Sequence, residues 1–327
     1  MSNSRPYLLL CRSPLHVGCG LSLDDIDLPV MRNVVTGHPM VPGSTLKGCI
    51  QEPAATAWSA TAGSRLANET LASLFGAEDA SPTAPVAETP SAESRKRAGG
   101  ATGMLCPQDA QLLAMPVASL AGGWAWATSP AVLHRLGRRL LQCGAAALPP
   151  VPEPPAQDGN DVALVAAGTP LVFNWADQRR LALADIPLLP EESTTLSAWA
   201  CWIARSAYPG DEHWQSLVES RFVVVADEVF DHFCRAATDV RSRNSIGDEG
   251  VTDDKFLWRE ECVPEESLFY GTVSVQAVQD NPGRLDEAQA LGFVKACSLQ
   301  IGGKASVGYG FVDFMPLDAG DAPAGTP

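Results

Sequence analysis

The chain reads, from residue 37 to residue 48, Gly37-His38-Pro39-Met40-Val41-Pro42-Gly43-Ser44-Thr45-Leu46-Lys47-Gly48. Proline and glycine followed by serine are typical of a helix start, so the segment predicts a helix with Ser44 as its N-cap. Free N–H groups at a helix start attract anions, and Lys47 adds a cation nearby. The segment is therefore a candidate phosphate site, and its alternative is a capped helix with one exposed lysine.

The stretch before this helix contains further polar and glycine residues. An apolar run at residues 7–11 predicts a buried strand. Between strand and helix lie His16, Gly18 and Gly20, and then three acids, Asp24, Asp25 and Asp27. Because glycine lets a backbone approach a ligand closely, this exit from the strand is a second candidate contact.

A glycine-rich segment near the C-terminus provides a third candidate contact. It reads Ile301-Gly302-Gly303-Lys304-Ala305-Ser306-Val307-Gly308-Tyr309-Gly310-Phe311. Its glycines permit close contact with a phosphate chain or a base. We predict a helix over residues 285–299 before it and a strand over residues 310–315 after it. That order, and the spacing of the glycines, exclude a P-loop and a dinucleotide-binding fingerprint.

The order of predicted elements indicates the fold class. A strand and a helix open the chain, and a strand, a helix and a strand close it. This order predicts an α+β fold with helices on one face of a sheet, and a split βαβ, ferredoxin-like core with large insertions fits it. We expect one elaborated domain over residues 1–317, insertions near residues 78–103 and 145–161, and a disordered tail at residues 318–327. The first insertion carries the basic cluster Arg95-Lys96-Arg97.

Composition limits the possible functions. Lys and Arg total 23 and Asp and Glu total 38, which gives a net charge of −15. This balance argues against a freestanding nucleic-acid binder and leaves room only for a local basic groove. The nine cysteines form no C-x-x-C pair, so neither disulfides nor a thiolate zinc site are expected. No apolar run has the length of a membrane helix and no signal pattern opens the chain, so we expect a cytoplasmic protein without a membrane partner.

Taken together, the three glycine-containing segments resemble the RAMP superfamily of CRISPR-associated RNA-binding proteins. Further stretches are also similar to that family: residues 74–76, 103–105, 109–113, 116–119, 124–130, 256–261, 264 and 267–270. The whole set resembles the multi-copy backbone subunit of the type III-B, or Cmr, effector complex. Two departures stand out: Cys19 lies where serine is more usual, and Ile50 and Gln51 follow Gly48 where arginine is common.

The resemblance implies an RRM-like palm with a protruding thumb hairpin. It implies copies stacked along a CRISPR guide RNA, with other Cmr-type subunits and a complementary single-stranded target RNA as further partners. The thumb of each copy would interrupt the guide–target duplex at regular intervals. We predict that the guide-RNA channel is lined by Gly18, Ser44, Lys47, Gly302, Gly303, Lys304 and Gly308.

The resemblance further implies metal-dependent cleavage of the paired target RNA, with Asp27 at the family's acidic position. Asp27 would hold Mg²⁺ or Mn²⁺, hard cations that prefer oxygen ligands. His16 is an acid or base in this reaction, or it holds the loop. Asp24 and Asp25 share the ion or are solvated loop acids. Glu260 approaches from another copy or is surface charge.

Three classes of function stay open at this level. The first is a target endoribonuclease that acts within a complex. The second is an RNA-binding scaffold in which Asp27 is catalytically silent. The third is an unrelated acidic enzyme whose glycine-rich loops bind a small phosphate ligand.

Overall fold

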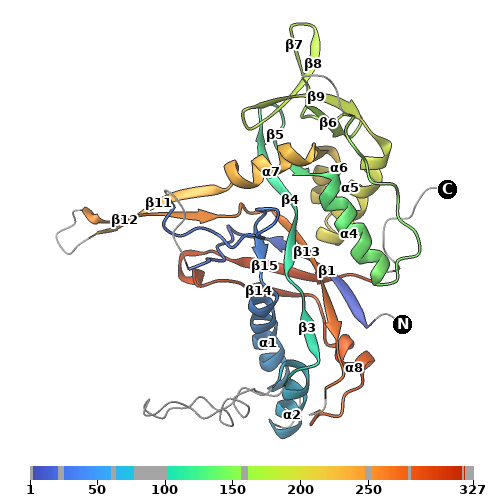
Figure 1. The fold of residues 1–327 in the computed structure, drawn as a ribbon, viewed down its shortest axis with the longest axis vertical. Coiled ribbons are helices and arrows are strands. Elements are labelled where there is room, and N and C mark those ends of the chain that lie inside the picture. The colour runs from blue at the N-terminus through green and yellow to red at the C-terminus, as the bar shows by residue number, and fades with distance from the viewer. Residues whose placement is uncertain are drawn as a thin grey trace.

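The computed structural model describes residues 3–20, 26–59, 64–76, 102–155, 161–246, 252–278, 281–318 and 320. Helices and strands are mixed along the chain, as predicted, and most strands belong to one continuous sheet (Figure 1). Most of the first predicted insertion, the basic cluster at residues 95–97 and residues 321–327 lie outside the described residues. In the described part of the chain, no helix has the length and apolar character needed to cross a membrane.

One half of the sheet joins the two ends of the chain. Its strands are β1 (Ser4–Cys11), β2 (Met40–Val41), β3 (Leu105–Pro107), β4 (Ala110–Ser119), β13 (Leu268–Val275), β14 (Cys297–Gln300) and β15 (Phe311–Pro316). The main strands lie in the order β14-β15-β1-β13-β4, and every neighbouring pair is antiparallel. β1 lies between two partners, which explains why Tyr7, Leu8, Leu9 and Leu10 are at most 1% exposed.

The other half of the sheet closes into a six-stranded barrel. It consists of β4 with β5 (Gly123–Thr128), β6 (Val162–Val165), β8 (Gln178–Leu183), β9 (Ile186–Glu192) and β10 (Phe222–Val224). The pairs run β4-β5-β10-β6-β9-β8, and a pairing of Ser119 with Leu183 brings β8 back to β4. A further strand, β7 (Phe173–Trp175), pairs with β8 and forms the hairpin at the top of Figure 1.

Helices cover both halves. Below the sheet in Figure 1 lie α1 (Gly43–Ser59), α2 (Ser64–Phe75) and α8 (Glu287–Gly292). Beside the barrel lie α4 (Pro130–Gln142), α5 (Thr194–Ala207), α6 (Glu212–Arg221) and α7 (Asp227–Ala236). Trp199 and Ile203 of α5 are completely buried, so this helix belongs to the core.

A separate two-stranded hairpin projects sideways from this body. It consists of β11 (Asp239–Ile246) and β12 (Thr252–Cys262), which pair antiparallel from Asp239 with Cys262 onward. In Figure 1 it extends to the left, away from the barrel and from α1. At its base, isolated bridges join Leu28 to Glu260 and Leu15 to Val263.

The helix predicted over residues 285–299 is wrong beyond its first half. α8 ends at Gly292, and residues 297–300 form β14, which pairs with β15. Leu299 is buried as part of this strand. The glycine-rich segment therefore connects two strands. The spacing of Leu291, Val294 and Leu299 is compatible with a helix, but pairing with β15 satisfies the backbone of Cys297–Gln300 and overrides it.

The start of α4 is capped by a side chain from another helix. Ser129 is the N-cap residue of α4, but its side chain makes no capping hydrogen bond. Instead the carboxylate of Asp227 accepts a hydrogen bond from the Ala131 N–H at 3.0 Å. In α7 the N-cap position belongs to Ala226, the residue before Asp227. A side chain from a neighbouring helix thus replaces the local cap.

Candidate RNA interface and cleavage site

The glycine-rich loop packs directly on the exit from β1. Gly302 has a φ of +91°, and a Cβ there would lie 2.3 Å from the carbonyl oxygen of His16. Gly310 has a φ of +80°, and a Cβ there would lie 2.0 Å from the Ile301 carbonyl oxygen. Since neither position has room for a side chain, both glycines are required by the fold. The second and third candidate segments of the sequence, the exit from β1 and the glycine-rich loop, therefore form one unit.

His16 is buried and has a fixed orientation. Its Nδ1 lies 2.7 Å from the carbonyl oxygen of Glu261. A carbonyl oxygen only accepts, so Nδ1 carries a proton and Nε2 is the acceptor of the neutral ring. Nε2 points toward exposed Gly18, where a Cβ would lie 3.0 Å from it. The geometry leaves Nε2 as the chemically available atom of His16.

Glu260 lies beside His16 in the fold. Ligand atoms of His16, Glu260 and Cys262 all lie within 4.8 Å of one another. The Glu260 side chain is almost completely buried, yet Lys304 Nζ lies 3.4 Å and Arg243 Nε 3.6 Å from its carboxylate oxygens. The expectation of surface charge at Glu260 is therefore wrong. The ion pairs of Glu260 with Lys304 and with Arg243 join the glycine-rich loop to the hairpin.

Asp27 lies at the base of the hairpin with an exposed carboxylate. One oxygen accepts a hydrogen bond from the backbone N–H of Arg259 in β12 at 2.8 Å. The next residue, Leu28, hydrogen-bonds the backbone on both sides of Glu260. Among the described residues, Asp27 does not join the cluster of His16, Glu260 and Cys262. Asp24 and Asp25 lie outside the described residues.

The donor atoms decide where a divalent cation fits. The cluster offers one nitrogen, one carboxylate and the Cys262 thiol, whose pKa burial raises to about 12. A protonated thiol is a poor ligand, and Mg²⁺ requires oxygen donors. Asp27 presents its second carboxylate oxygen to solvent, where phosphate oxygens would complete a coordination shell. Asp27 therefore suits Mg²⁺ or Mn²⁺ better than the buried cluster does.

Glu261 fixes the loop that carries Asp27. Its buried carboxylate accepts hydrogen bonds from the Val30 N–H at 2.9 Å and from Thr238 Oγ1 at 2.8 Å. It also forms an ion pair with Arg32, whose guanidinium donates to the carbonyl oxygens of Gly37 and Cys234 at 2.8 Å. Neighbouring acids of β12 thus point to opposite sides: Glu260 toward the glycine-rich loop and Glu261 toward the Asp27 loop.

Two arginines of the hairpin pack against the glycine-rich loop. Arg241 and Arg243 lie over the Tyr309 ring, with 5.5 and 5.2 Å from guanidinium carbon to ring centroid. Both guanidinium groups hydrogen-bond the Tyr309 hydroxyl, the Arg241 bond measuring 3.0 Å. With Lys304 they place three cations here against two carboxylates, because Arg241 pairs with Asp239 and the other two pair with Glu260. The surface keeps a small positive excess on a chain of net charge −15. Such a surface suits phosphate groups.

The start of α1 is less open to an anion than the sequence suggests. The helix begins at Gly43, so Ser44 is its second residue and not its N-cap. Asp109, in the break between β3 and β4, accepts the Gly43 N–H at 2.8 Å. Ser44 is exposed and Lys47 is half-buried. The first free donor of the helix is therefore occupied by a carboxylate.

Hydrogen-bonded backbone connects this helix start to the glycine-rich loop. Gly18 bridges Val30, the Met31 N–H donates to the Val17 carbonyl, and Met40 pairs with both Met31 and Gln111. The two predicted RNA contacts therefore lie along one ladder of extended segments. The hydrogen-bonded segments around Gly18, Met31 and Met40 lie between these two contacts, so a ligand that touches both must be long.

This chain is similar to known proteins in both sequence and fold. The sequence profile of the RAMP superfamily matches residues 8–313. This chain belongs to the RAMP superfamily. An unrelated acidic enzyme, the third class left open by the sequence, is thereby excluded.

Individual RAMP relatives match over nearly the full length. The chain is 27% identical over 302 residues to the CRISPR system Cmr endoribonuclease Cmr4 of Pyrococcus furiosus, covering 92% of this chain and 91% of that protein. The crystal structure of oligomeric Cmr4 from Pyrococcus furiosus superposes with a TM-score of 0.64 at 21% identity, covering 97% and 98% of the two chains. A chain of the type III-B Cmr-beta complex bound to cognate target RNA gives a TM-score of 0.62 at 17% identity, covering 96% of each.

Sequence reasoning missed several residues of this RAMP site. Arg241 and Arg243 were not singled out, although their spacing of two in a strand places them on one face. Glu261 and Arg32 were not recognised as an ion pair, because their positions are 229 residues apart in the chain. Only the fold brings them together.

Proposed function

We propose that this chain is a repeated backbone subunit of a type III-B CRISPR effector complex that binds guide RNA and cuts the paired target RNA. The observation that carries the proposal is the near-full-length similarity to a protein named Cmr endoribonuclease Cmr4, combined with the cationic surface of Lys304, Arg241 and Arg243. Its partners are guide RNA, complementary single-stranded target RNA, further copies and other Cmr-type subunits. A cytoplasmic location follows from that role.

In this proposal β15-β1-β13-β4 is the RRM-like palm. The order of the elements supports this assignment. The elements follow one another in the chain as β1, α1, β4, β13, α8 and β15, and this is the order of a split βαβ unit. The hairpin of β11 and β12 is the thumb that interrupts the guide–target duplex. Its separate sheet and sideways projection support this assignment.

The guide RNA runs along the ladder from the glycine-rich loop to α1. Gly303 and Gly308 are exposed, and Lys304 is half-exposed on that loop. Gly18 is exposed beside them, and Ser44 and Lys47 lie at the far end. Gly302 supports the loop by packing on His16. Backbone N–H groups, two lysines and two arginines would then contact successive phosphates in a sequence-independent manner.

Cleavage uses the target's own 2′-hydroxyl as nucleophile. Attack on the adjacent phosphorus forms a cyclic phosphate and expels the 5′-oxygen of the next nucleotide. A-form geometry aligns these atoms poorly, so a thumb that displaces one nucleotide increases the rate by positioning. A Mg²⁺ or Mn²⁺ ion at Asp27 would stabilise charge that develops on phosphate oxygens. His16 Nε2 is an acceptor suited to the 2′-hydroxyl proton, or it only maintains the loop.

Asp27→Asn tests the cleavage proposal. The amide can keep the hydrogen bond to the Arg259 N–H but loses the charge, so assembly and target binding should stay intact. Cleavage of guide-paired RNA should fall at least about a hundredfold, the loss expected for one electrostatic contact in a transition state. EDTA should reproduce this loss in the unmutated complex. Asp185→Asn, an exposed acid in the barrel, is the matched control.

A scaffold without cleavage activity is the second candidate. It is favoured by one observation: Asp27 stands apart from the cluster of His16, Glu260 and Cys262. If the complex with wild-type Asp27 binds target but does not cut it in Mg²⁺ or Mn²⁺, this candidate is correct. If Asp24→Asn or Asp25→Asn abolishes cutting while Asp27→Asn does not, the acidic position has been assigned wrongly.

A further inference from the structure

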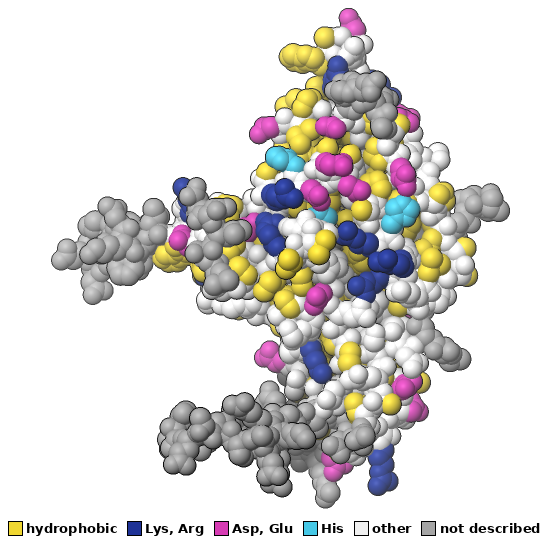
Figure 2. Space-filling view, viewed as in Figure 1, with side chains coloured by type: hydrophobic (Ala, Val, Ile, Leu, Met, Phe, Trp, Pro, Cys, Tyr) yellow, Lys and Arg dark blue, Asp and Glu magenta, His cyan; other side chains and the backbone are white. Residues whose placement is uncertain are grey.

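The hairpin of β7 and β8 ends in an exposed tryptophan. Trp175 is 71% exposed, immediately before a two-residue turn in which Ala176 and Asp177 have φ values of 49° and 60°. The turn pairs Trp175 with Gln178 and holds the indole away from the barrel. In Figure 1 this hairpin is the uppermost projection, and Figure 2 shows apolar, acidic and basic side chains at that end. An indole in this position is available for a partner.

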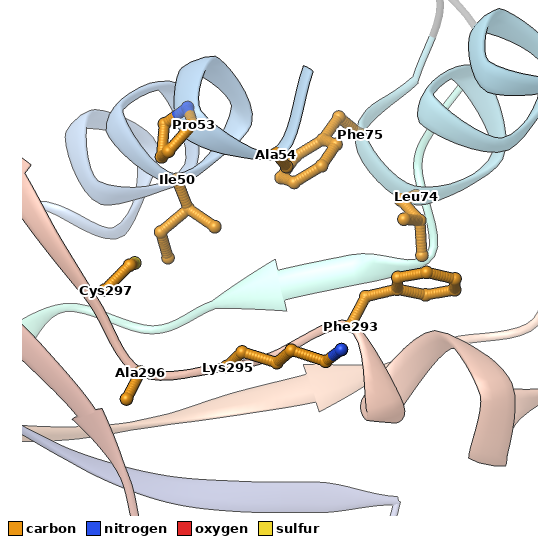
Figure 3. A pocket seen from close by; sticks show the side chains of 9 residues that line it. All are labelled: Ile50, Pro53, Ala54, Leu74, Phe75, Phe293, Lys295, Ala296 and Cys297. Atoms are coloured by element: carbon orange, nitrogen blue, oxygen red, sulfur yellow. The ribbon is translucent and has the colours of Figure 1, made fainter. Parts of the chain in front are cut away.

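An apolar pocket lies at the opposite end of the long axis. It has a volume of about 330 Å³ and lies between α1, α2 and the segment that leads into β14. Figure 3 shows Ile50, Pro53 and Phe75 on the helices facing Phe293 and Cys297 across it. A cavity of roughly 150 Å³ accommodates benzene. The pocket therefore has room for the larger indole ring.

The hairpin tip and the pocket carry opposite charges, and each lies next to an end strand of the sheet. Lys295 is the single charged residue that lines the pocket; it is exposed and forms no ion pair with any described residue. Asp177, two residues from Trp175, is likewise exposed and unpaired within the described chain. β7 and β14 are the two ends of the strand order, so each has one edge without a partner among the described strands.

A nucleic acid fits the hairpin less well. Asp177 at the tip would repel phosphate, and Arg179 is already paired with Glu192 at 2.8 Å. Arg180, which hydrogen-bonds the Gln178 side chain, is the one cation of β8 without an ion pair to a described residue. The β7–β8 hairpin and the helices α1 and α2, which line the pocket, lie at opposite ends of the molecule, so the two do not meet within one chain (Figure 1). A second copy of this chain carries the apolar and charged groups that match the tip, and contact with a different subunit is an outcome that the test below distinguishes.

We propose that Trp175 of one copy inserts into the pocket of the next copy, with Asp177 beside Lys295. The inference rests on the proposed function, because it requires several copies on one guide RNA. A knob and a pocket at opposite ends make a heterologous interface, which extends a row of copies instead of closing a dimer. A docked tryptophan surrounded by apolar groups is a typical energetic centre of such an interface.

Photocrosslinking tests the contact directly. With p-benzoylphenylalanine in place of Trp175, the complex assembled on guide RNA should give a crosslinked pair of copies, mapped to residues 50–54 or 293–297. The same probe in place of Leu120, which is 74% exposed, should give no such product. A crosslink to RNA or to a different subunit, or no crosslink to protein, overturns the proposal.

Truncation of Trp175 and charge reversal at two exposed residues provide an independent test. Trp175→Ala should raise the protein concentration for half-maximal assembly on guide RNA about thirtyfold, as for a hot-spot residue. Asp177→Lys and Lys295→Glu should each weaken assembly, and the double reversal should restore it. Assembly at an unchanged concentration in all variants overturns this inference alone. A wild-type chain that fails to assemble on guide RNA would instead contradict the proposed function.

Discussion

The glycine-rich loop at residues 301–310 and the helix start at residues 42–48 look alike in sequence but have different surroundings in the fold. The loop is backed by His16 and by cations from the hairpin. The helix start faces Asp109, which takes its first N–H. The surroundings of each segment are therefore decided by side chains that distant parts of the chain place against the backbone, and not by the glycine pattern alone.

The largest expected effect is a difference in folding stability between substitutions at two adjacent glycines of the loop. Gly302→Ala places a Cβ against the His16 carbonyl at a φ of +91°, whereas Gly303 has open space around it. We expect Gly302→Ala to lower the free energy of unfolding by about 2–4 kcal/mol. Gly303→Ala should change it by less than about 0.5 kcal/mol. Chemical denaturation measures both, and equal effects would show that the loop does not depend on its contact with His16.

The next effect compares the two lysines. Lys304→Ala and Lys47→Ala should each reduce the salt dependence of assembly on guide RNA by about one unit, if each contacts one phosphate. Lys304→Ala should also destabilise the fold by about 1–3 kcal/mol, because buried Glu260 keeps only Arg243 as a counter-charge. Lys47→Ala should not. Titrations at several salt concentrations test the channel, and unchanged assembly in the double variant would count against it.

The smallest effect concerns the acid at the helix start. Asp109→Asn keeps an oxygen for the Gly43 N–H and removes a negative charge beside the proposed RNA path. Affinity for guide RNA should rise about two- to fivefold at low salt, the scale of a charge at a helix terminus. The gain should vanish at high salt. A fall in affinity would mean that Asp109 positions the helix for RNA and does not oppose binding.

Local patterns predicted the elements whose stability is local. The strand at residues 7–11, the helix that follows Pro42 and the final strand are all present, because apolar runs and helix starts are encoded by neighbouring residues. The helix predicted over residues 285–299 failed where β15 offered a strand partner. The barrel was not foreseen, since its closure depends on a pairing between Ser119 and Leu183.

The candidate site shows the same division. Asp27, His16 and the glycine-rich loop were selected from sequence, and their catalytic and RNA-binding roles stay predictions. The structure adds that Glu260 lies beside His16 within one chain, and that Arg241 and Arg243 cover Tyr309. These contacts join positions more than 60 residues apart, as the separations of 66 and 68 between Tyr309 and the two arginines illustrate. Periodicity cannot reveal them.

The position of β1 has a consequence for synthesis of the chain. Its two partners, β13 and β15, end at Val275 and Pro316, so the first strand made is completed by the last one. At a ribosomal rate of roughly 5–20 residues per second, about 300 residues take on the order of 15–60 s to follow. During that interval Leu8, Leu9 and Leu10, which are at most 1% exposed in the finished fold, have no sheet to join. The nascent N-terminus is thus a natural client for chaperones, and the barrel, whose strands lie between residues 110 and 224, has time to form first.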